Sequence, residues 1–174
     1  MYENCFLCRK KATLITPDAG NERIYHVECE TCGSYVIDVE YKFFLDELLP
    51  SVRANLSGFV RAAKEYENKE TVLTWESINE YLDSYIPVYH LEKVEKILTY
   101  IEFKTNKSGG EVKIEPHKDY PLAFAMDERE MLWALNKGVE LGCLKTKDCV
   151  NYTIEANGRE KLKVILQDII YEVS

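Results

Sequence analysis

The sequence predicts an α+β protein in which an N-terminal four-cysteine zinc ribbon packs on a mostly helical, winged-helix-like unit. Three observations predict this class. Two C-x2-C pairs flank a segment with strand-like composition. From about residue 40 the apolar residues adopt helical spacing. Near the C-terminus a helix is followed by a hairpin pattern. We therefore divide the chain into a ribbon at 1–39 and a helical domain at 40–174.

The cysteine pattern is the strongest chemical signal in the chain. Cys5 and Cys8 form one C-x2-C pair, and Cys29 and Cys32 form the second after an interval of twenty residues. Two cysteines so spaced on a tight turn can direct both sulfurs to one ion at about 2.3 Å. Gly33 follows the last cysteine, where the backbone must turn sharply. The pattern predicts one structural zinc ion per chain, held in a closed and non-catalytic site.

Other readings of the cysteines are weaker. Disulfides require an oxidising compartment, and a redox C-x2-C normally lies in a βαβ pattern, which is absent from this sequence. His26 lies near Cys29 and could replace a cysteine ligand, but its neighbours predict a strand. Cys143 and Cys149 match no metal template, and we expect small apolar residues on a hairpin.

The segment around the cysteines is expected to form strands. Residues 12–15 and 23–27 are rich in strand formers and flank a turn at 17–21. A third strand is expected at 34–39, because β-branched and aromatic residues dominate there. The order of turn, hairpin, turn and strand is that of a zinc ribbon.

Helical spacing then predicts helices at 41–49 and 51–63. Pro50 should end the first helix, and Ser51 should cap the second. A short helix is expected after Thr74. An amphipathic helix is expected over 91–103.

The last third of the chain predicts a strand, a helix and a hairpin. Residues 111–115 alternate like a half-buried strand. A helix is expected over 127–141, because Asp127 opens a capping box and Gly142 can end the helix. Residues 142–154 form the clearest wing, with 104–115 as a less regular candidate. A final helix is expected from Glu155 onward.

Charge favours a protein partner over nucleic acid. The chain carries 22 Lys and Arg against 30 Asp and Glu, for a net charge of −8. DNA binding draws much of its affinity from basic side chains on phosphates. We expect a protein partner or self-association, with a DNA-binding transcription regulator as the alternative. The candidate contacts for nucleic acid or another anionic ligand form one basic strip: Lys104, Lys107, Lys113 and Lys118.

Catalytic and targeting motifs are absent from the sequence. It has no phosphate-binding glycine loop, no G-x-S-x-G and no H-E-x-x-H, so we expect no enzyme activity. His90 is expected to cap or pack beside a helix, and His117 to lie in a loop. No apolar run approaches the ~18 residues of a membrane helix, and residues 1–5 do not resemble a signal peptide. We therefore expect a cytoplasmic protein without a membrane partner.

The order of motifs resembles the N-terminal zinc-ribbon plus winged-helix modules of bacterial conflict-system proteins. The resemblance rests on the two cysteine pairs and on three later segments: Leu56-Ser57-Gly58, 121–124 and 152–158. In that family a TIR-like or nucleoside-deoxyribosyltransferase-like effector domain follows the module. The resemblance implies a role in recognition or oligomerisation in bacterial defence. This chain contains no effector domain, so it either acts with a partner in trans or is the recognition part of a longer NAD- or nucleotide-cleaving effector.

Overall fold

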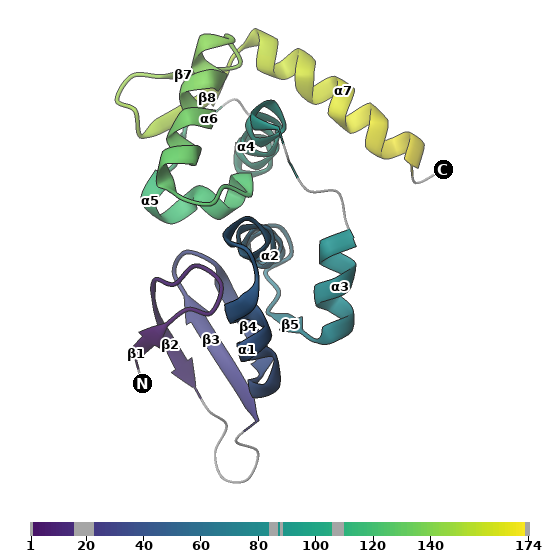
Figure 1. Ribbon diagram of the computed structural model, residues 1–174. Coiled ribbons are helices and arrows are strands. Elements are labelled where there is room, and N and C mark those ends of the chain that lie inside the picture. The colour runs from purple at the N-terminus through teal and green to yellow at the C-terminus, as the bar shows by residue number, and fades with distance from the viewer. Residues whose placement is uncertain (1, 16–22, 84–86, 88, 106–109, 173–174) are drawn as a thin grey trace.

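The computed structural model describes residues 2–15, 23–83, 87, 89–105 and 110–172, and it shows an α+β protein (Figure 1). A five-stranded sheet dominates the N-terminal half, with its strands in sequence order. The strands are β1 (Tyr2–Asn4), β2 (Lys11–Ile15), β3 (Ile24–Cys29), β4 (Gly33–Asp38) and β5 (Thr71–Leu73). Neighbours from β1 to β4 are antiparallel, whereas β5 lies parallel to β4.

One face of this sheet is buried because the side chains of each strand alternate between two faces. In β2 the buried residues are Ala12 and Leu14, and in β4 they include Tyr35 and Ile37. The helices α1 (Val39–Glu47) and α2 (Pro50–Ala62) both contact β4. The three strands predicted at 12–15, 23–27 and 34–39 are confirmed as β2, β3 and β4, and β1 and β5 are additions that the sequence did not predict.

The helices α1 and α2 correct the predictions for Pro50 and Ser51. Pro50 does not end the first helix; it is the first residue of α2, where its missing N–H costs no hydrogen bond. Ser51 is therefore inside α2, and no side chain caps that helix. A π-helical turn, η1 (Ala63–Glu67), extends α2, and α3 (Trp75–Asp83) confirms the helix expected after Thr74.

The C-terminal half combines helices with a small antiparallel sheet of order β6-β8-β7. Its elements are α4 (His90–Thr105), β6 (Val112–Lys113), α5 (Pro116–Asp119), η2 (Tyr120–Ala123), α6 (Glu128–Glu140), β7 (Leu144–Thr146), β8 (Asn151–Ile154) and α7 (Ala156–Glu172). The predicted helices, the hairpin and Gly142 just after α6, at φ +66°, are confirmed. The strand expected at 111–115 shortens to β6. Part of the 104–115 wing candidate lies outside the described residues.

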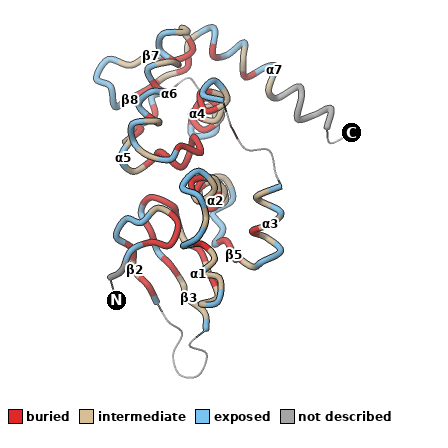
Figure 2. The backbone as a smooth tube through the Cα atoms, in the orientation of Figure 1, coloured by how far each residue is buried: buried red, intermediate tan, exposed pale blue. Residues whose placement is uncertain are grey.

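Two hydrophobic clusters fill the molecule, one in each half (Figure 2). The N-terminal cluster runs from Cys5 to Ile78, so it includes residues of α1, α2 and α3. The C-terminal cluster runs from Val94 to Leu162. The sequence division at residue 40 therefore does not coincide with the division between the buried clusters. In the described part of the chain, no helix combines the length and apolar character needed to cross a bilayer.

The N-terminus of α6 provides a test of local stability. The Asp127 carboxylate accepts hydrogen bonds from the backbone N–H groups of Glu130, at 3.0 Å, and Arg129, at 2.9 Å. These bonds lower the pKa of Asp127, with the Glu130 N–H as the largest cause. The ionised Asp127 cap therefore stabilises the fold fully at pH values above the ordinary aspartate pKa. This stabilisation is lost as the pH falls through the lowered pKa of the folded chain.

We expect Asp127→Ala to lower the free energy of unfolding by about 1 kcal/mol at neutral pH. Asp127→Asn should retain most of the cap at neutral pH, because asparagine is an equally good N-cap residue. Denaturant melts at several pH values check this. Equal stability of the alanine and aspartate chains at neutral pH would contradict it.

Candidate metal centre

Four cysteine sulfurs meet in the N-terminal half, and they lie within 4.8 Å of one another. Cys5 and Cys8 occupy the turn between β1 and β2, and Cys29 and Cys32 flank the turn between β3 and β4. The sulfurs of Cys5 and Cys32 are 3.7 Å apart, and those of Cys8 and Cys29 are 3.5 Å apart. A tetrahedral ion with 2.3 Å bonds to sulfur requires separations of about 3.8 Å. The cluster therefore fits one tetrahedral metal ion.

Backbone hydrogen bonds shape the first cysteine turn, Cys5–Lys10. The N–H of Cys5 donates to the carbonyl of Lys10 at 2.7 Å, and the N–H of Arg9 donates to the carbonyl of Cys5 at 2.9 Å. Arg9 follows the second cysteine with φ +63°, a conformation that a non-glycine residue rarely adopts. The Arg9 guanidinium pairs with Asp46 of α1 at 2.5 Å, which ties this turn to the helical layer.

The second cysteine turn, Cys29–Gly33, closes the β3–β4 hairpin. Gly33 pairs with Cys29 and has φ +98°, which confirms the sharp turn expected at that glycine. The N–H of Cys32 also donates to the Cys29 sulfur at 3.4 Å. The two turns together bring the four sulfurs within 4.8 Å of one another.

Hydroxyl groups surround the sulfurs. The Tyr35 oxygen accepts the Phe6 N–H at 3.2 Å, so its own proton can go to the Cys5 sulfur, also 3.2 Å away. The Ser57 hydroxyl lies 3.0 Å from the Cys32 sulfur. Such donors stabilise thiolate charge and orient the ligands, as outer-shell groups do in metal sites.

A tyrosine from the C-terminal half also lies near the cysteines. Cys8 packs against the C-terminal hydrophobic cluster, which includes Tyr120, and the Lys10 ammonium lies 4.9 Å from the centre of the Tyr120 ring. Burial raises the pKa of Tyr120, so its hydroxyl keeps its proton. Hydrogen-bonding groups therefore lie beside three of the sulfurs: Tyr35 at Cys5, Ser57 at Cys32 and the Cys32 N–H at Cys29.

Without a bound cation, the pKa values of the four cysteines shift in different directions. Burial raises the pKa of Cys32 well above its ordinary value, whereas the neighbouring Cys32 side chain is the largest cause that lowers the pKa of Cys29. Four thiolates at these separations repel one another, so a divalent ion is what allows all four to lose their protons. Three of the four cysteines are buried and Cys8 is half-buried, which leaves little room for a substrate at the ion.

The other candidate ligands lie elsewhere. His26 is on β3, where its ring nitrogen lies 3.6 Å from Glu70, and it is not part of the sulfur cluster. Cys143 is buried in the C-terminal cluster, as expected for a small apolar residue. Cys149 differs from that expectation: it is exposed at the tip of the β7–β8 turn with φ +58°, because the Asp148 side chain organises this turn.

The two remaining histidines are exposed and lie in helices. His90 begins α4 and contacts the Trp133 ring at 4.2 Å between centroids, which agrees with the packing role expected of it. His117 is in α5 and not in a loop, and its carbonyl accepts a hydrogen bond from Lys10. Pro116 is the first residue of α5 and Pro121 the second residue of η2, because proline suits the first turn of a helix.

The predicted basic strip is largely paired with acids. Lys104 lies 2.6 Å from Glu65, and Lys113 lies 3.0 Å from Glu115. Lys118 lies 3.5 Å from Glu30. The fourth member, Lys107, is outside the described residues.

No protein-family model, curated protein or solved structure matches the chain. The site therefore rests on its own geometry. Sequence reasoning located the four cysteines but missed Tyr35, Ser57 and Tyr120, because a hydroxyl residue at those positions carries no spacing signal. Only the folded chain brings β4, α2 and η2 to the same cluster.

Proposed function

We propose that this chain is a non-catalytic recognition module whose N-terminal half is held together by one structural zinc ion. The observation that carries the proposal is the closed cluster of four mutually close cysteines. The ligand set favours zinc, because tetrahedral four-thiolate sites are typical of structural zinc. A closed site offers no open position for a substrate, so the metal serves the fold and not a reaction.

The C-terminal half supports a winged-helix interpretation. Its elements run helix, strand, helix, helix, strand, strand, helix, and the sheet order β6-β8-β7 places the first strand beside the last. In that arrangement α6 takes the position of the recognition helix and β7–β8 form the wing. The assignment rests on element order and strand pairing.

The exposed surface of α6 suits a protein better than DNA. Leu132 and Trp133 are both 42% exposed, and Met126 just before the helix is 52% exposed. Asp127 and Glu128 at its start would repel phosphate. Aromatic and apolar side chains are the usual anchors of protein interfaces. We therefore propose a protein partner or a second copy of the chain.

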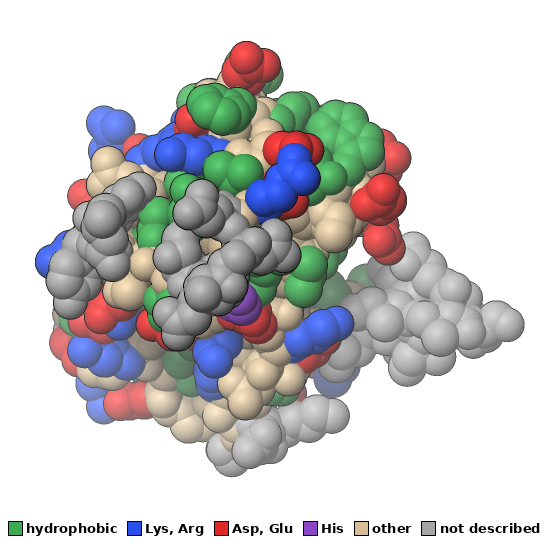
Figure 3. Space-filling view, turned by 90° about the horizontal axis from the view of Figure 1, so that it is seen from below, with side chains coloured by type: hydrophobic (Ala, Val, Ile, Leu, Met, Phe, Trp, Pro, Cys, Tyr) green, Lys and Arg blue, Asp and Glu red, His purple; other side chains and the backbone are tan. Residues whose placement is uncertain are grey.

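DNA binding is the second candidate, because the winged-helix order favours it. Against it, the described members of the basic strip each have a carboxylate partner. On the face seen in Figure 3, Lys and Arg side chains lie interspersed with Asp and Glu. Such a surface provides a weak electrostatic footprint for nucleic acid.

A salt series with duplex DNA separates the two candidates. A protein-binding module should bind DNA no more tightly than about 10⁻⁶ M at physiological salt, which is the non-specific level. The triple change of Lys107, Lys113 and Lys118 to Glu should then change the affinity for duplex DNA little. The control Lys163→Glu on α7 should also change this affinity little. Lys104 is left unchanged because its partner Glu65 is largely buried and also pairs with Arg61, whereas the carboxylate partners of Lys113 and Lys118 are exposed. Tight, steeply salt-dependent binding that only the triple variant loses would instead establish the DNA-binding regulator.

The same proposal includes the absence of enzyme activity. We expect this chain alone to turn over neither NAD nor nucleosides, whether or not an effector domain acts beside it. Measurable release of nicotinamide or free base by the purified chain would contradict this. The bacterial-defence setting implied by the resemblance, and the cytoplasmic location, stay predictions.

A further inference from the structure

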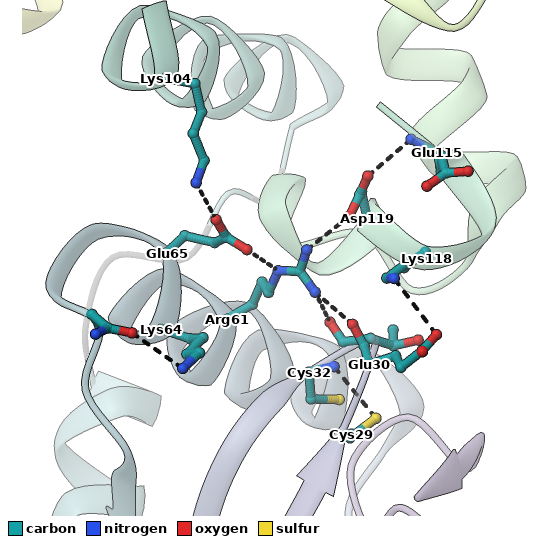
Figure 4. Close-up of polar contacts among 12 residues, drawn as sticks. Cys29, Glu30, Cys32, Arg61, Lys64, Glu65, Lys104, Glu115, Lys118 and Asp119 are labelled. Atoms are coloured by element: carbon teal, nitrogen blue, oxygen red, sulfur yellow. Dashed lines mark hydrogen bonds and ion pairs between the residues drawn. The ribbon is translucent and has the colours of Figure 1, made fainter. Parts of the chain in front are cut away.

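One arginine joins the two halves of the molecule at the metal centre (Figure 4). Arg61 of α2 is only 7% exposed. One terminal nitrogen donates to the carbonyls of Glu30 and Thr31, at 2.7 and 3.1 Å. The other donates to Asp119 at 2.8 Å. The Nε atom makes no hydrogen bond within the described part of the chain, but it lies 3.1 Å from a Glu65 carboxylate oxygen as an ion pair. The guanidinium therefore interacts with three separate segments.

The two carbonyls belong to the second cysteine turn. Glu30 and Thr31 are the residues between Cys29 and Cys32, so their carbonyl directions depend on how those two cysteines are held. A metal ion bound by both sulfurs fixes this turn. Arg61 thus contacts backbone whose shape depends on the ion, without contacting a sulfur itself.

The acidic partners lead into the C-terminal half. The Asp119 carboxylate is buried and also accepts the N–H of Glu115 at 2.8 Å, which closes the short helix α5. Glu65 pairs in addition with Lys104 of α4 at 2.6 Å. Arg61, Glu65, Lys104 and Asp119 form what we call the Arg61 network, with two positive and two negative charges.

The same segment touches the first cysteine turn. Tyr120 follows Asp119 directly, and Cys8 packs against the hydrophobic cluster that includes Tyr120. Lys10, in the first cysteine turn, donates to the carbonyl of His117, and its ammonium lies 4.9 Å from the centre of the Tyr120 ring. Residues 115–120 therefore contact both cysteine turns, one through Arg61 and the other through Lys10.

We propose that occupancy of the four-cysteine site controls the packing of segment 115–120, and through it the junction between the two halves. The proposal rests on the proposed metal site and adds a consequence for the C-terminal half. When the ion leaves, the carbonyls of the second turn no longer align on Arg61, and Asp119 loses the fixed position of its charged partner. Apolar contacts elsewhere at the junction, such as Phe124 on Phe59 at 5.0 Å between ring centroids, do not involve the turns and should persist.

Hydrogen exchange on the full chain tests the proposal, with the metal content measured in the same samples. Removing zinc with a chelator should accelerate exchange in peptides covering both cysteine turns and in peptides covering 112–126. Exchange in β7 and β8 should change least, because that hairpin contacts neither turn. If the metal leaves and the turns exchange faster while 112–126 keeps its protection, the proposal is overturned. If the folded chain binds no metal at all, the proposed function itself fails.

Substitution of Arg61 tests the coupling in the opposite direction, because coupling between two sites is reciprocal. Arg61→Met should lower zinc affinity by about tenfold to a hundredfold in competition with a chromophoric chelator, the range seen for outer-shell groups. Lys64→Met is the matched control: it removes the same charge one turn away from an exposed side chain whose ammonium pairs with Asn68. Asp119→Asn is the milder second variant and should weaken zinc binding less. Wild-type zinc affinity in both Arg61→Met and Asp119→Asn would overturn the proposal.

Discussion

Cys32→Ala is expected to abolish metal binding and to unfold the N-terminal half. Cys32 is fully buried, and its sulfur lies beside Cys5 and the Ser57 hydroxyl. Structural zinc supplies roughly 10 kcal/mol or more of folding free energy in small zinc domains. The free energy of unfolding of a whole domain is only about 5–15 kcal/mol, so the remaining interactions do not keep the N-terminal half folded once the ion is lost. Metal analysis together with far-ultraviolet circular dichroism checks the result.

Cys149→Ser is the matched control for this change. It also removes one thiol, but Cys149 is exposed on the β7–β8 turn, outside the sulfur cluster. The control should retain the metal and the wild-type melting temperature. A Cys32→Ala chain that melts like the control would contradict the account of the metal centre.

Gly158→Ala should destabilise the C-terminal half by about 3 kcal/mol, toward the upper end of the overpacking range. A Cβ at this position in α7 would lie 2.3 Å from the carbonyl oxygen of Cys143. Moving that oxygen away would break its hydrogen bond with the N–H of Glu155, which it accepts at 2.9 Å. The start of α7 must therefore separate from the strand region, which a denaturant melt would detect.

Gly138→Ala distinguishes this clash from the general effect of replacing a helical glycine. Both changes gain up to about 1 kcal/mol of helix propensity. At Gly138 of α6, however, the added Cβ meets the end of the Leu144 side chain at 2.7 Å, and that end can shift. We expect a clearly smaller loss than at Gly158. Equal losses at both positions would show that backbone contact is not the cause.

Much of the fold could be predicted from local pattern. The cysteine spacing located the two turns, and strand-forming residues on either side of a turn located β2, β3 and β4. Helical spacing and the Asp127 cap located α6. These signals work because each element carries its own periodicity or cap in a short stretch of chain.

The elements that were missed depend on distant partners. β5 has three residues and exists because β4 offers it a parallel neighbour, a pairing between segments separated by two helices. Pro50 ends one helix in the sequence pattern but begins another in the structure, and proline is compatible with both.

The candidate site also combines residues that sequence spacing predicts with residues that only the tertiary structure identifies. Its four ligands follow from spacing alone, because metal geometry restricts where cysteines can lie. Arg61 and Tyr120 could not be recognised, since a single arginine or tyrosine in a helical segment is ordinarily a surface or packing residue. Only tertiary structure places the Arg61 guanidinium on the second cysteine turn and the Tyr120 ring beside Lys10 of the first cysteine turn.

The most direct test of the metal centre is elemental analysis of the natively purified chain, combined with a thiol titration before and after chelation. We predict one zinc ion per chain, with Cys149 as the readily reactive thiol before chelation and four further thiols released to reagent when the ion is removed. A fully folded chain that contains no metal, or one whose four cysteines are joined in disulfides, would contradict the account.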